Sequence, residues 1–424
     1  MANQTAKNIL ALYDETCKQM NDNFAFASQM EVDTQSGVDL QNANNVYWKS
    51  VEQQAPVIEG FDLSGTTPGN IIEQTYPLNV SAPRNDWFTL RAEELRDRRF
   101  MERRAQAAAR KLSADANQRA SDLVTTTGSI YYESTSVGFN FLSEANTILR
   151  ERQAYRDMGT SFFLTPRESQ IMASDLASRT LYPNNRSEEA YATAMIGEKV
   201  AGFDRVFEAA TYGNIAARAN ATGGAIASNV TEVPEGFTTV GGSIQNVDYR
   251  FGVLPLGLGE GANFQVGDAV VVAGVNSVGL MDKTDTGQLM TFRVIAKNGD
   301  NLTVYPKPIA ANQAGITSSQ AAYANISTAI VATMAVSAVN VIGGRANSFW
   351  ANDSVSFVNA DGNLEVLNEF EGMKVDSTTL DNGIKLYIAY DSNLSTLNCR
   401  VRLFTWYGLV NRDPSRNGNA VYVG

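Results

Sequence analysis

Residues 86–123 read DWFTLRAEELRDRRFMERRAQAAARKLSADANQRASDL, and they carry the strongest helical pattern of the 424-residue chain. Apolar side chains recur at near-helical spacing, and neither Gly nor Pro interrupts them before Gly128. They are Trp87, Leu90, Leu95, Met101, Ala105, Ala108, Leu112, Ala116, Ala120 and Leu123. Asp86 stands where an N-cap residue is expected, because its carboxylate can accept from the first free amides of a helix. The stretch therefore predicts one long helix that begins at Asp86.

The exposed face of this helix is rich in charge. Residues 91–111 contain eight basic side chains against four acidic ones, and Glu94 is placed to pair with Arg98 at i+4. A solvated helix face explains this pattern, and so does ion pairing with neighbouring copies of the chain. Under the second interpretation, Arg91, Arg98 and Arg103 are candidate contact residues.

The N-terminal segment predicts a second amphipathic helix. Its apolar stripe recurs every three or four positions and consists of Leu10, Tyr13, Cys17, Met20 and Phe24. Residues 30–45 then turn polar, so we expect the helix to be the tip of an extended arm whose stripe contacts a partner. Packing of the stripe on its own domain is the alternative.

Residues 48–83 predict a long projecting β-hairpin. Four prolines and three glycines interrupt strand-like pieces such as residues 71–78. A loop of this length without a core of its own is either functional or disordered, and its apolar members favour docking on another surface. The candidate contact residues of this segment are Trp48, Phe61, Ile71 and Ile72.

The next region, residues 126–219, predicts a mixture of helices and short strands. Helices are expected at 143–157, from Thr165 onward and at 187–210, with a strand at 161–164. Gly159 follows the first of these helices as a stop signal. Thr165 and Glu168 have the spacing of a capping box, with Pro166 at the first helical position.

Residues 220–344 predict a separate all-β module. They hold 17 of the 33 glycines, the helical periodicity disappears, and Asn298-Gly299-Asp300 is a strong hairpin signal. Regular turn spacing indicates a small barrel or sandwich. Beyond it, a hairpin turning at residues 381–383 and a strand at 399–406 are expected, the strand with Cys399 and Leu403 on one face and Arg400 and Arg402 on the other.

The composition argues against an enzyme. The chain has no histidine and only two cysteines, Cys17 and Cys399, which excludes histidine triads, His-ligated zinc and thiolate zinc sites. Gly257-x-Gly259-x-Gly261 lacks the third glycine of a dinucleotide fingerprint at the required spacing and precedes no predicted helix. We therefore expect no catalytic residue, no cofactor and no metal ligand.

The charge balance and the hydropathy bear on partners and location. The formal net charge is −11, so any contact with DNA is expected to be weak and non-specific. The N-terminus lacks the basic and apolar regions of a signal peptide, and the apolar residues 329–342 are too few to span a bilayer. We expect a chain without a membrane anchor in a reducing cytoplasm. Without histidine, its assemblies should also be indifferent to pH between about 6 and 8.

Short words of sequence, collinear along nearly the whole chain, resemble a known family. They are VEQQ (51–54), EGFDL (59–63), NDWFTLRAEELRD (85–97), RDMGTS (156–161), VAGFD (200–204), KP (307–308), AYAN (322–325), MAV (334–336), EGMK (371–374) and WYG (406–408). The chain resembles the major capsid proteins of tailed bacteriophages with the Hong Kong ninety-seven fold. It is most similar to coat proteins of short-tailed phages of the P-twenty-two type, which carry an inserted β-barrel.

The resemblance implies an α+β capsid fold and a domain order. The implied parts are an N-terminal arm (1–45), an E-loop (46–84), a peripheral domain with a spine helix (85–125), an axial domain (126–219), an inserted β-barrel domain (220–344), a continuation of the axial and peripheral domains (345–395), and a C-terminal strand and tail of the peripheral domain (396–424). Lys49 is the only lysine near the E-loop, so we expect a shell without covalent cross-links.

The same resemblance implies a function and partners. The expected function is a structural coat protein that assembles with scaffolding protein into an icosahedral procapsid, which expands on packaging double-stranded DNA. The implied partners are hexamers and pentamers of the chain itself, scaffolding protein, portal protein and loosely held DNA, in a virion capsid assembled in the cytoplasm of the bacterial host.

One departure from the family pattern concerns the contacts between capsomers. The loop at 238–249 lacks the acidic tip of the family's inter-capsomer contact, which leaves Asp248 and Arg250 as its candidate charges.

Two alternatives to a coat protein stay open at this stage. One is a carboxylate glycosidase of a phage particle, which would need two acidic side chains facing each other in a cleft. The other is a surface module that binds carbohydrate or cells, which the β-rich insertion could supply.

Overall fold

The computed structural model describes residues 2–23, 26–35, 45–50, 61–64, 71–78, 80, 82–91, 93–154, 159–178, 197–218, 223–236, 239–240, 243–244, 247–360, 364, 368, 373–393 and 398–424. The described part mixes helices and strands, which confirms the expected α+β class. Its contacts divide the chain into two compact units. Unit 1 comprises residues 1–45, 78–121 and 355–410, and unit 2 comprises residues 46–77, 122–354 and 411–424.

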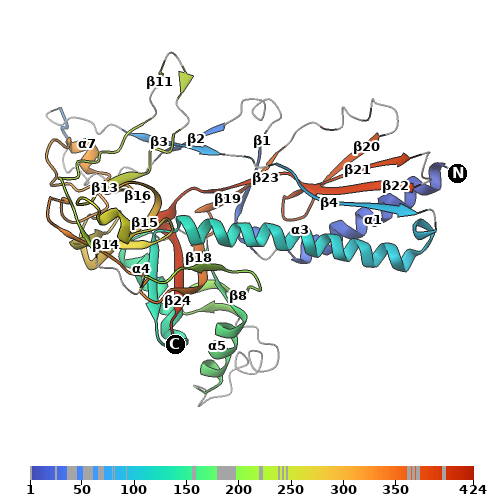
Figure 1. The fold of residues 1–424 in the computed structure, drawn as a ribbon, viewed down its shortest axis with the longest axis horizontal. Coiled ribbons are helices and arrows are strands. Elements are labelled where there is room, and N and C mark those ends of the chain that lie inside the picture. The colour runs from blue at the N-terminus through green and yellow to red at the C-terminus, as the bar shows by residue number, and fades with distance from the viewer. Residues whose placement is uncertain are drawn as a thin grey trace. The chain divides into compact units, whose positions relative to one another are not determined.

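Unit 1 is built on a four-stranded antiparallel sheet, in the order β20-β21-β22-β4 (Figure 1). Its strands are β20 (Met373–Thr379), β21 (Lys385–Asn393), β22 (Asn398–Thr405) and β4 (Arg84–Arg91). Along β22, buried Cys399, Val401 and Leu403 alternate with exposed Arg400 and Arg402, which confirms the predicted alternation. The predicted hairpin also exists, since residues 380–384 form the turn between β20 and β21.

The long helix begins later than the sequence analysis predicts. α3 spans Arg98–Thr127 and follows a short 3-10 helix, η2 (Glu94–Arg96). Asp86 is not its N-cap but lies in β4, opposite Leu403 of β22. The actual cap is Asp97, whose Oδ1 accepts from the amides of Arg99 at 3.0 Å and Phe100 at 3.2 Å. Pairing with β22 along the whole of β4 overrides the near-helical spacing of its apolar residues.

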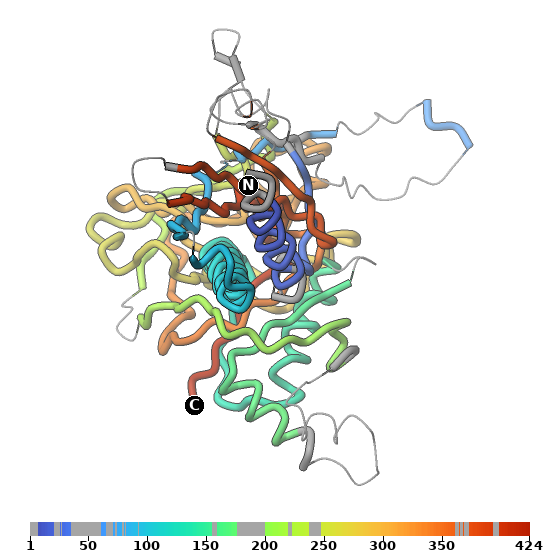
Figure 2. Tube along the Cα trace, turned by 90° about the vertical axis from the view of Figure 1, so that its right-hand side faces the viewer, coloured from blue at the N-terminus to red at the C-terminus, as the bar shows by residue number. Residues whose placement is uncertain are grey.

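The N-terminal helix α1 (Ala2–Asn23) packs within its own unit. Ile9, Leu12, Tyr13 and Met20 are buried, and the Tyr13 hydroxyl donates to the carbonyl of Leu386 in β21 at 2.6 Å. Figure 2 shows α1 running beside α3. The expectation of an exposed arm tip is wrong, because β21 of the same unit is available to the apolar stripe; the alternative, packing on its own domain, is correct.

Residues 31–35, expected in a polar arm, join a sheet instead. β1 (Glu31–Gln35) follows the 3-10 turn η1 (Ala27–Gln29) and pairs in parallel with β19 (Val355–Ala360). β23 (Tyr407–Asn411) completes this three-stranded sheet on the other side of β19. Residues 31–35 are thus placed in a strand by backbone hydrogen bonds, which cannot be predicted from the hydropathy of their side chains.

Unit 2 contains the base of the predicted hairpin. β2 (Asn45–Ser50) and β3 (Glu73–Leu78) pair as a two-stranded sheet. Of the connection between them, residues 61–64 and 71–72 are described, and the remainder lies outside the described residues.

A seven-stranded sheet forms the largest element of unit 2. Its order is β5-β24-β18-β6-β8-β7, with β9 beside β18. The strands are β5 (Ile130–Ser134), β24 (Asn417–Tyr422), β18 (Gly344–Ala351), β6 (Thr160–Leu164), β8 (Phe203–Glu208), β7 (Gly197–Val200) and β9 (Gly213–Ile215). Four buried phenylalanines pack against one another on this sheet, with ring centroids 5.2–6.1 Å apart in four contacts; they are Phe141, Phe162, Phe203 and Phe349.

The helices of this region agree with the sequence in part. α4 (Phe139–Glu151) begins before the expected residue 143 and ends before residue 157, and α5 (Pro166–Ser178) begins at Pro166 as predicted. The predicted capping box is not formed, since Thr165 Oγ1 is buried without a hydrogen-bond partner. The helix expected at 187–210 is wrong within the described part, because β7 and β8 form a hairpin there, with Ala201 and Gly202 at φ +52° and +89°. The 3-10 turn η5 (Pro414–Arg416) precedes β24.

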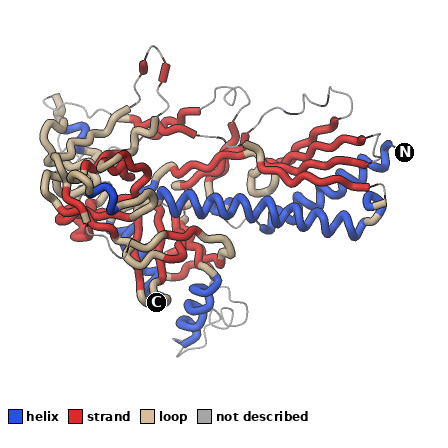
Figure 3. The backbone as a smooth tube through the Cα atoms, in the orientation of Figure 1, coloured by secondary structure: helices blue, strands red, loops and turns tan. Residues whose placement is uncertain are grey.

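The predicted β-module is a closed barrel of six strands, and strands and loops make up most of its part of the chain (Figure 3). Its strands, in sheet order, are β10 (Gly224–Ala225), β17 (Ala335–Ala338), β14 (Ala269–Val278), β15 (Asp285–Asn298), β16 (Asn301–Tyr305) and β13 (Gly252–Pro255). A bridge between Ile226 and Leu256 joins the two ends of this path, so barrel rather than sandwich is the correct alternative. β15 and β16 turn at residues 298–301, as predicted.

The barrel has its own core, which lies entirely between Ile226 and Ala338. Its short accessory elements are β11 (Thr239–Val240), β12 (Ser243–Ile244), η3 (Glu260–Asn263) and α7 (Ser318–Ala321). The Gly257-x-Gly259-x-Gly261 loop is fixed within the module, because Asp300 accepts from the amides of Gly259 and Gly261.

Candidate interaction surfaces

The three arginines predicted to contact other copies are exposed and lie at the end of β4 and in the first turns of α3. Arg91 ends β4, Arg98 begins α3, and Arg103 follows one turn later. The predicted Glu94–Arg98 pair is not formed, because Glu94 precedes the helix and accepts from the Arg91 amide at 2.8 Å. Arg98 pairs instead with Glu102 at 2.9 Å, and its side chain keeps 92% of its surface exposed. An exposed pair of this kind adds little stability, so these cations remain accessible to a partner.

Two other basic residues of α3 serve the unit itself. Asp86, only 2% exposed, accepts from Arg104 at 2.5 Å and from Lys111 at 2.9 Å. The Arg104 guanidinium also lies over the Phe88 ring at 3.9 Å. These contacts hold β4 against α3. They also explain why Asp86, an acidic residue, is buried on the inward face of β4.

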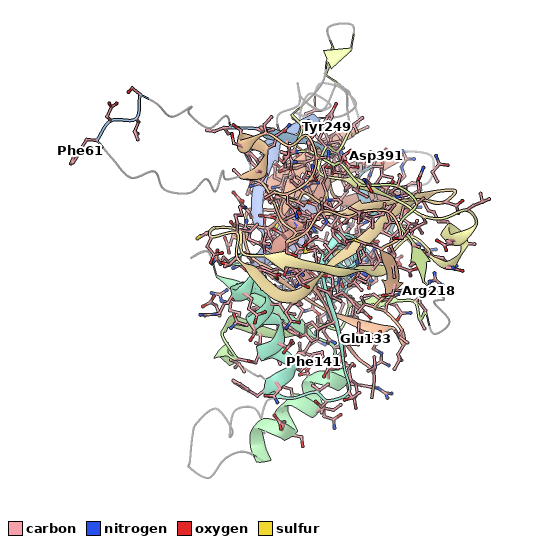
Figure 4. The ribbon with its side chains drawn as sticks, turned by 90° about the vertical axis from the view of Figure 1, so that its left-hand side faces the viewer. Phe61, Glu133, Phe141, Arg218, Tyr249 and Asp391 are labelled. Carbon is pink, nitrogen blue, oxygen red and sulfur yellow. The ribbon has the colours of Figure 1, made fainter. Side chains whose placement is uncertain are left out.

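The predicted apolar contact residues of the hairpin differ in exposure. Phe61 (labelled in Figure 4) and Ile71 are exposed, at 113% and 61% of their reference surface. Ile72 packs partly against a cluster that includes Ile309 and Tyr323, and its amide donates to the Tyr323 hydroxyl at 2.8 Å. Trp48 lies in β2, and its side chain is outside the described residues.

Asp248 and Arg250 form an internal ion pair. Their side chains are 10% and 11% exposed, and the guanidinium meets the carboxylate through two hydrogen bonds, at 2.9 Å from Nε and 2.6 Å from Nη2. This pair is engaged inside unit 2, so it does not present free charge for a contact between chains. The sequence alone does not distinguish an internal ion pair from a charge pair between chains, because both use the same residue types.

An exposed groove on the four-stranded sheet of unit 1 is a surface that the sequence analysis missed. It has a volume of about 410 Å³ and is lined by Asn85, Trp87, Met373, Ala389, Tyr390, Asp391, Arg400 and Arg402. Trp87 is 69% exposed and Met373 39%. Tryptophan, methionine and arginine are enriched at protein interfaces. The alternation of apolar and polar side chains along residues 88–91 is typical of a strand with one exposed face, but the prediction of a helix from Asp86 conceals it.

A pair of buried arginines joins the barrel to the rest of unit 2. Arg293 of β15 donates from Nε to the carbonyl of Gly128, directly after α3, at 3.2 Å. Thr291 donates to the carbonyl of Ser129 at 2.6 Å and accepts from Arg152 at 3.2 Å. Burial lowers the pKa of both Arg152 and Arg293 to about 10. Both remain cationic near neutral pH.

The described residues show little sign of chemistry. They contain no group of three or more His, Cys, Asp or Glu side chains that could hold a metal ion. Burial raises the pKa of both the Cys17 and the Cys399 thiol to about 11, so neither is a reactive thiolate at neutral pH. Burial lowers the pKa of Lys283 to about 8, and its Nζ donates to the carbonyl of Ala324 at 3.0 Å. Among the helices in the described part, none is long and apolar enough to cross a membrane.

A family model described as P22 coat protein - gene protein 5 matches residues 1–422. The chain is also similar to solved structures of phage proteins. The "Capsid structure of the Cyanophage P-SCSP1u" is 9% identical, with 93% of this chain and 87% of that chain covered and a TM-score of 0.44. The "Asymmetric unit of bacteriophage PhiM1 mature capsid" is 10% identical, with 93% and 86% covered and a TM-score of 0.41. The "CUS-3 coat protein I-domain" is 29% identical over 28% of this chain and 94% of that chain, with a TM-score of 0.21.

Proposed function

The chain belongs to the P22 coat protein family, and from that premise we propose that its copies assemble with a scaffolding protein into a procapsid that expands when double-stranded DNA is packaged. The chain is a major capsid protein, a structural and non-enzymatic component of the virion capsid that acts in many copies. The family match gives no support to a glycosidase or to a carbohydrate-binding module.

The domain assignment is part of the proposal. We take residues 1–45 as the arm, 46–84 as the E-loop, 85–125 as the spine segment of the peripheral domain, and 220–344 as the inserted barrel. The axial domain then comprises 126–219 and shares 345–395 with the peripheral domain, which ends with 396–424. The self-contained core of the barrel supports the boundary at 220–344.

The proposed contacts between copies use the exposed members of the predicted set. Phe61 and Ile71 expose apolar surface that a neighbouring copy could bury, and Trp48 belongs to the same hairpin. Exposed charge is presented by Arg91 at the end of β4 and by Arg98 and Arg103 at the start of α3. The observation that carries this proposal is Phe61, an aromatic side chain 113% exposed in the isolated chain.

The test is assembly with and without the scaffolding protein. We expect the chain alone to remain monomeric or to form aberrant particles, because no single chain specifies the curvature of a shell. With scaffolding protein, sedimentation and electron microscopy should show uniform closed shells. Phe61→Ser should reduce the yield of closed shells. The matched control is Leu258→Ser, because Leu258 is a comparably exposed apolar residue that lies in the barrel and not in the hairpin. Uniform shells from the coat protein alone would refute the requirement for a scaffold.

Further partners follow from the same proposal. A portal protein would occupy one vertex, and packaged DNA would make weak contacts because the chain carries a net charge of −11. Assembly would take place in the cytoplasm of the bacterial host. Cross-linking of purified particles followed by mass spectrometry would identify the portal and scaffolding contacts.

A further inference from the structure

The guanidinium of Arg250 lies at a junction of three segments that are distant in sequence. Besides its pair with Asp248, its Nη1 donates to the carbonyls of Asn411 at 2.6 Å and Arg412 at 3.1 Å. Its Cζ lies 4.0 Å from the centroid of the Tyr76 ring and 5.2 Å from that of Tyr305. One side chain thus contacts β3 of the hairpin, β16 of the barrel and the segment at 411–412.

The backbone supports the same junction. The amide of Tyr249 (labelled in Figure 4) donates to the carbonyl of Thr75 in β3 at 3.1 Å, and the amide of Lys307 donates to the carbonyl of Arg250 at 2.9 Å. Thr75 and Tyr76 are fully or almost fully buried, at 0% and 2% exposure. The base of the hairpin is therefore packed, although Phe61 and Ile71 farther along it are exposed.

Only arginine can make this set of contacts. Four of its N–H groups are engaged at once, two with a carboxylate and two with carbonyls, while the planar face lies over an aromatic ring. A lysine in its place keeps the charge but has a single nitrogen and no planar face. Burial alone lowers the pKa of Arg250, but Tyr305 and the Asp248 carboxylate more than compensate, so the net pKa is raised and the side chain stays cationic.

We propose that Arg250 is a positioning residue for assembly, which fixes the base of the β2–β3 hairpin to the barrel and to the segment at 411–412. The direction in which the hairpin projects from its base then depends on this guanidinium. This inference rests on the proposed function, in which the hairpin contacts a neighbouring copy. A misdirected hairpin would weaken assembly even in a correctly folded monomer.

The experiment compares Arg250→Lys with Arg218→Lys. Arg218 (Figure 4) is a control, because it also pairs with a carboxylate within unit 2: its Nε donates to both oxygens of Asp268, at 3.0 and 2.8 Å. Amide hydrogen exchange of the monomers is measured at residues 73–76, at Leu78 and at Tyr249. We expect about tenfold faster exchange there for Arg250→Lys and no change for Arg218→Lys, with a corresponding loss of assembly rate for Arg250→Lys alone.

A second pair of variants covers the case in which Arg250→Lys does not fold. Tyr76→Leu removes the ring under the guanidinium and leaves the ion pair, and Tyr76→Phe restores the aromatic face. We expect Tyr76→Leu to accelerate exchange of β3 and slow assembly, and Tyr76→Phe to lie closer to the parent chain. Unchanged exchange at β3 in both Tyr76→Leu and any folded Arg250→Lys would overturn the proposal. Faster exchange with unchanged assembly would retain the local anchor but refute its role in assembly, whereas failure of the parent chain to form shells would refute the proposed function alone.

Discussion

Replacing Asp86 by Asn tests whether an ion pair that the sequence hides holds β4 on α3. Asp86 is 2% exposed, and both of its oxygens accept from cations of α3. Asn keeps the size and one acceptor but removes the charge. A hydrogen bond to a charged group is worth about 1.5–3 kcal/mol, and the Arg104 contact, at 22% side-chain exposure, falls in this class. The Lys111 contact adds little, since that side chain is 69% exposed.

We therefore expect Asp86→Asn to lower the free energy of unfolding of unit 1 by about 2 kcal/mol. The loss stays below the value for a fully buried pair, because the released Arg104 and Lys111 can reach water. Amide exchange of α3 residues 101–112 reports this local unfolding directly, and it avoids assuming that a chain of two units unfolds in one step.

The matched control is Asp391→Asn in the same sheet. Asp391 pairs with Arg400, whose side chain is 45% exposed, so no resolvable change is expected. The effect of Asp86→Asn should also persist at high salt, which screens exposed pairs far more than buried ones. An Asp86→Asn chain within about 0.5 kcal/mol of the parent, or one no worse than Asp391→Asn, would refute the reasoning.

Three further outcomes follow from the structure. Asp97→Ala should destabilise the start of α3 by about 1 kcal/mol, measurable as faster exchange of its first turn, whereas Asp97→Asn should be nearly neutral because Asn also caps. Burial lowers the pKa of Lys283 from 10.5 to about 8, so between these two pH values the folded chain binds fewer protons at Lys283 than the unfolded chain does. The free energy of unfolding should therefore rise with pH across that window and stay flat from about pH 6 to 8. Thermal melts of the parent and of Lys283→Met check this, and a rise that survives in the variant would contradict it. The fragment 220–344 should fold alone into a β-rich monomer, because its core is self-contained; a random-coil circular dichroism spectrum would contradict this.

Local patterns predicted those elements whose geometry is encoded by neighbouring residues. The alternation at 399–406 and the turn at Asn298-Gly299-Asp300 both appear as expected, because each depends on a period or a turn conformation that a few residues determine. The Ala201-Gly202 turn offered the same kind of signal within the predicted helix at 187–210, and it was outweighed by apolar spacing.

The misread elements depend on partners distant in sequence. Residues 84–91 become a strand because β22, more than 300 positions later, pairs with them; a helical pattern of apolar residues contains no information about that partner. The stripe of α1 is equally compatible with its own unit and with a neighbouring copy. Asp248 and Arg250 likewise have the residue types of an interface pair, and only their burial assigns them to the interior.

The attachment of the barrel shows how neutral acceptors can hold a buried cation. Arg293 donates to the carbonyls of Gly128 and Gly267, so it is held by neutral acceptors, one of them immediately beyond the last residue of α3. The carboxyl end of a 30-residue helix carries partial negative charge, which favours a cation at this position. Because this attraction depends on the geometry of the last helical turn, a change in that turn would alter the support of the barrel as well. The end of α3 and the orientation of β15 are therefore coupled through Arg293 and Thr291, and no separate ion pair is needed to link them.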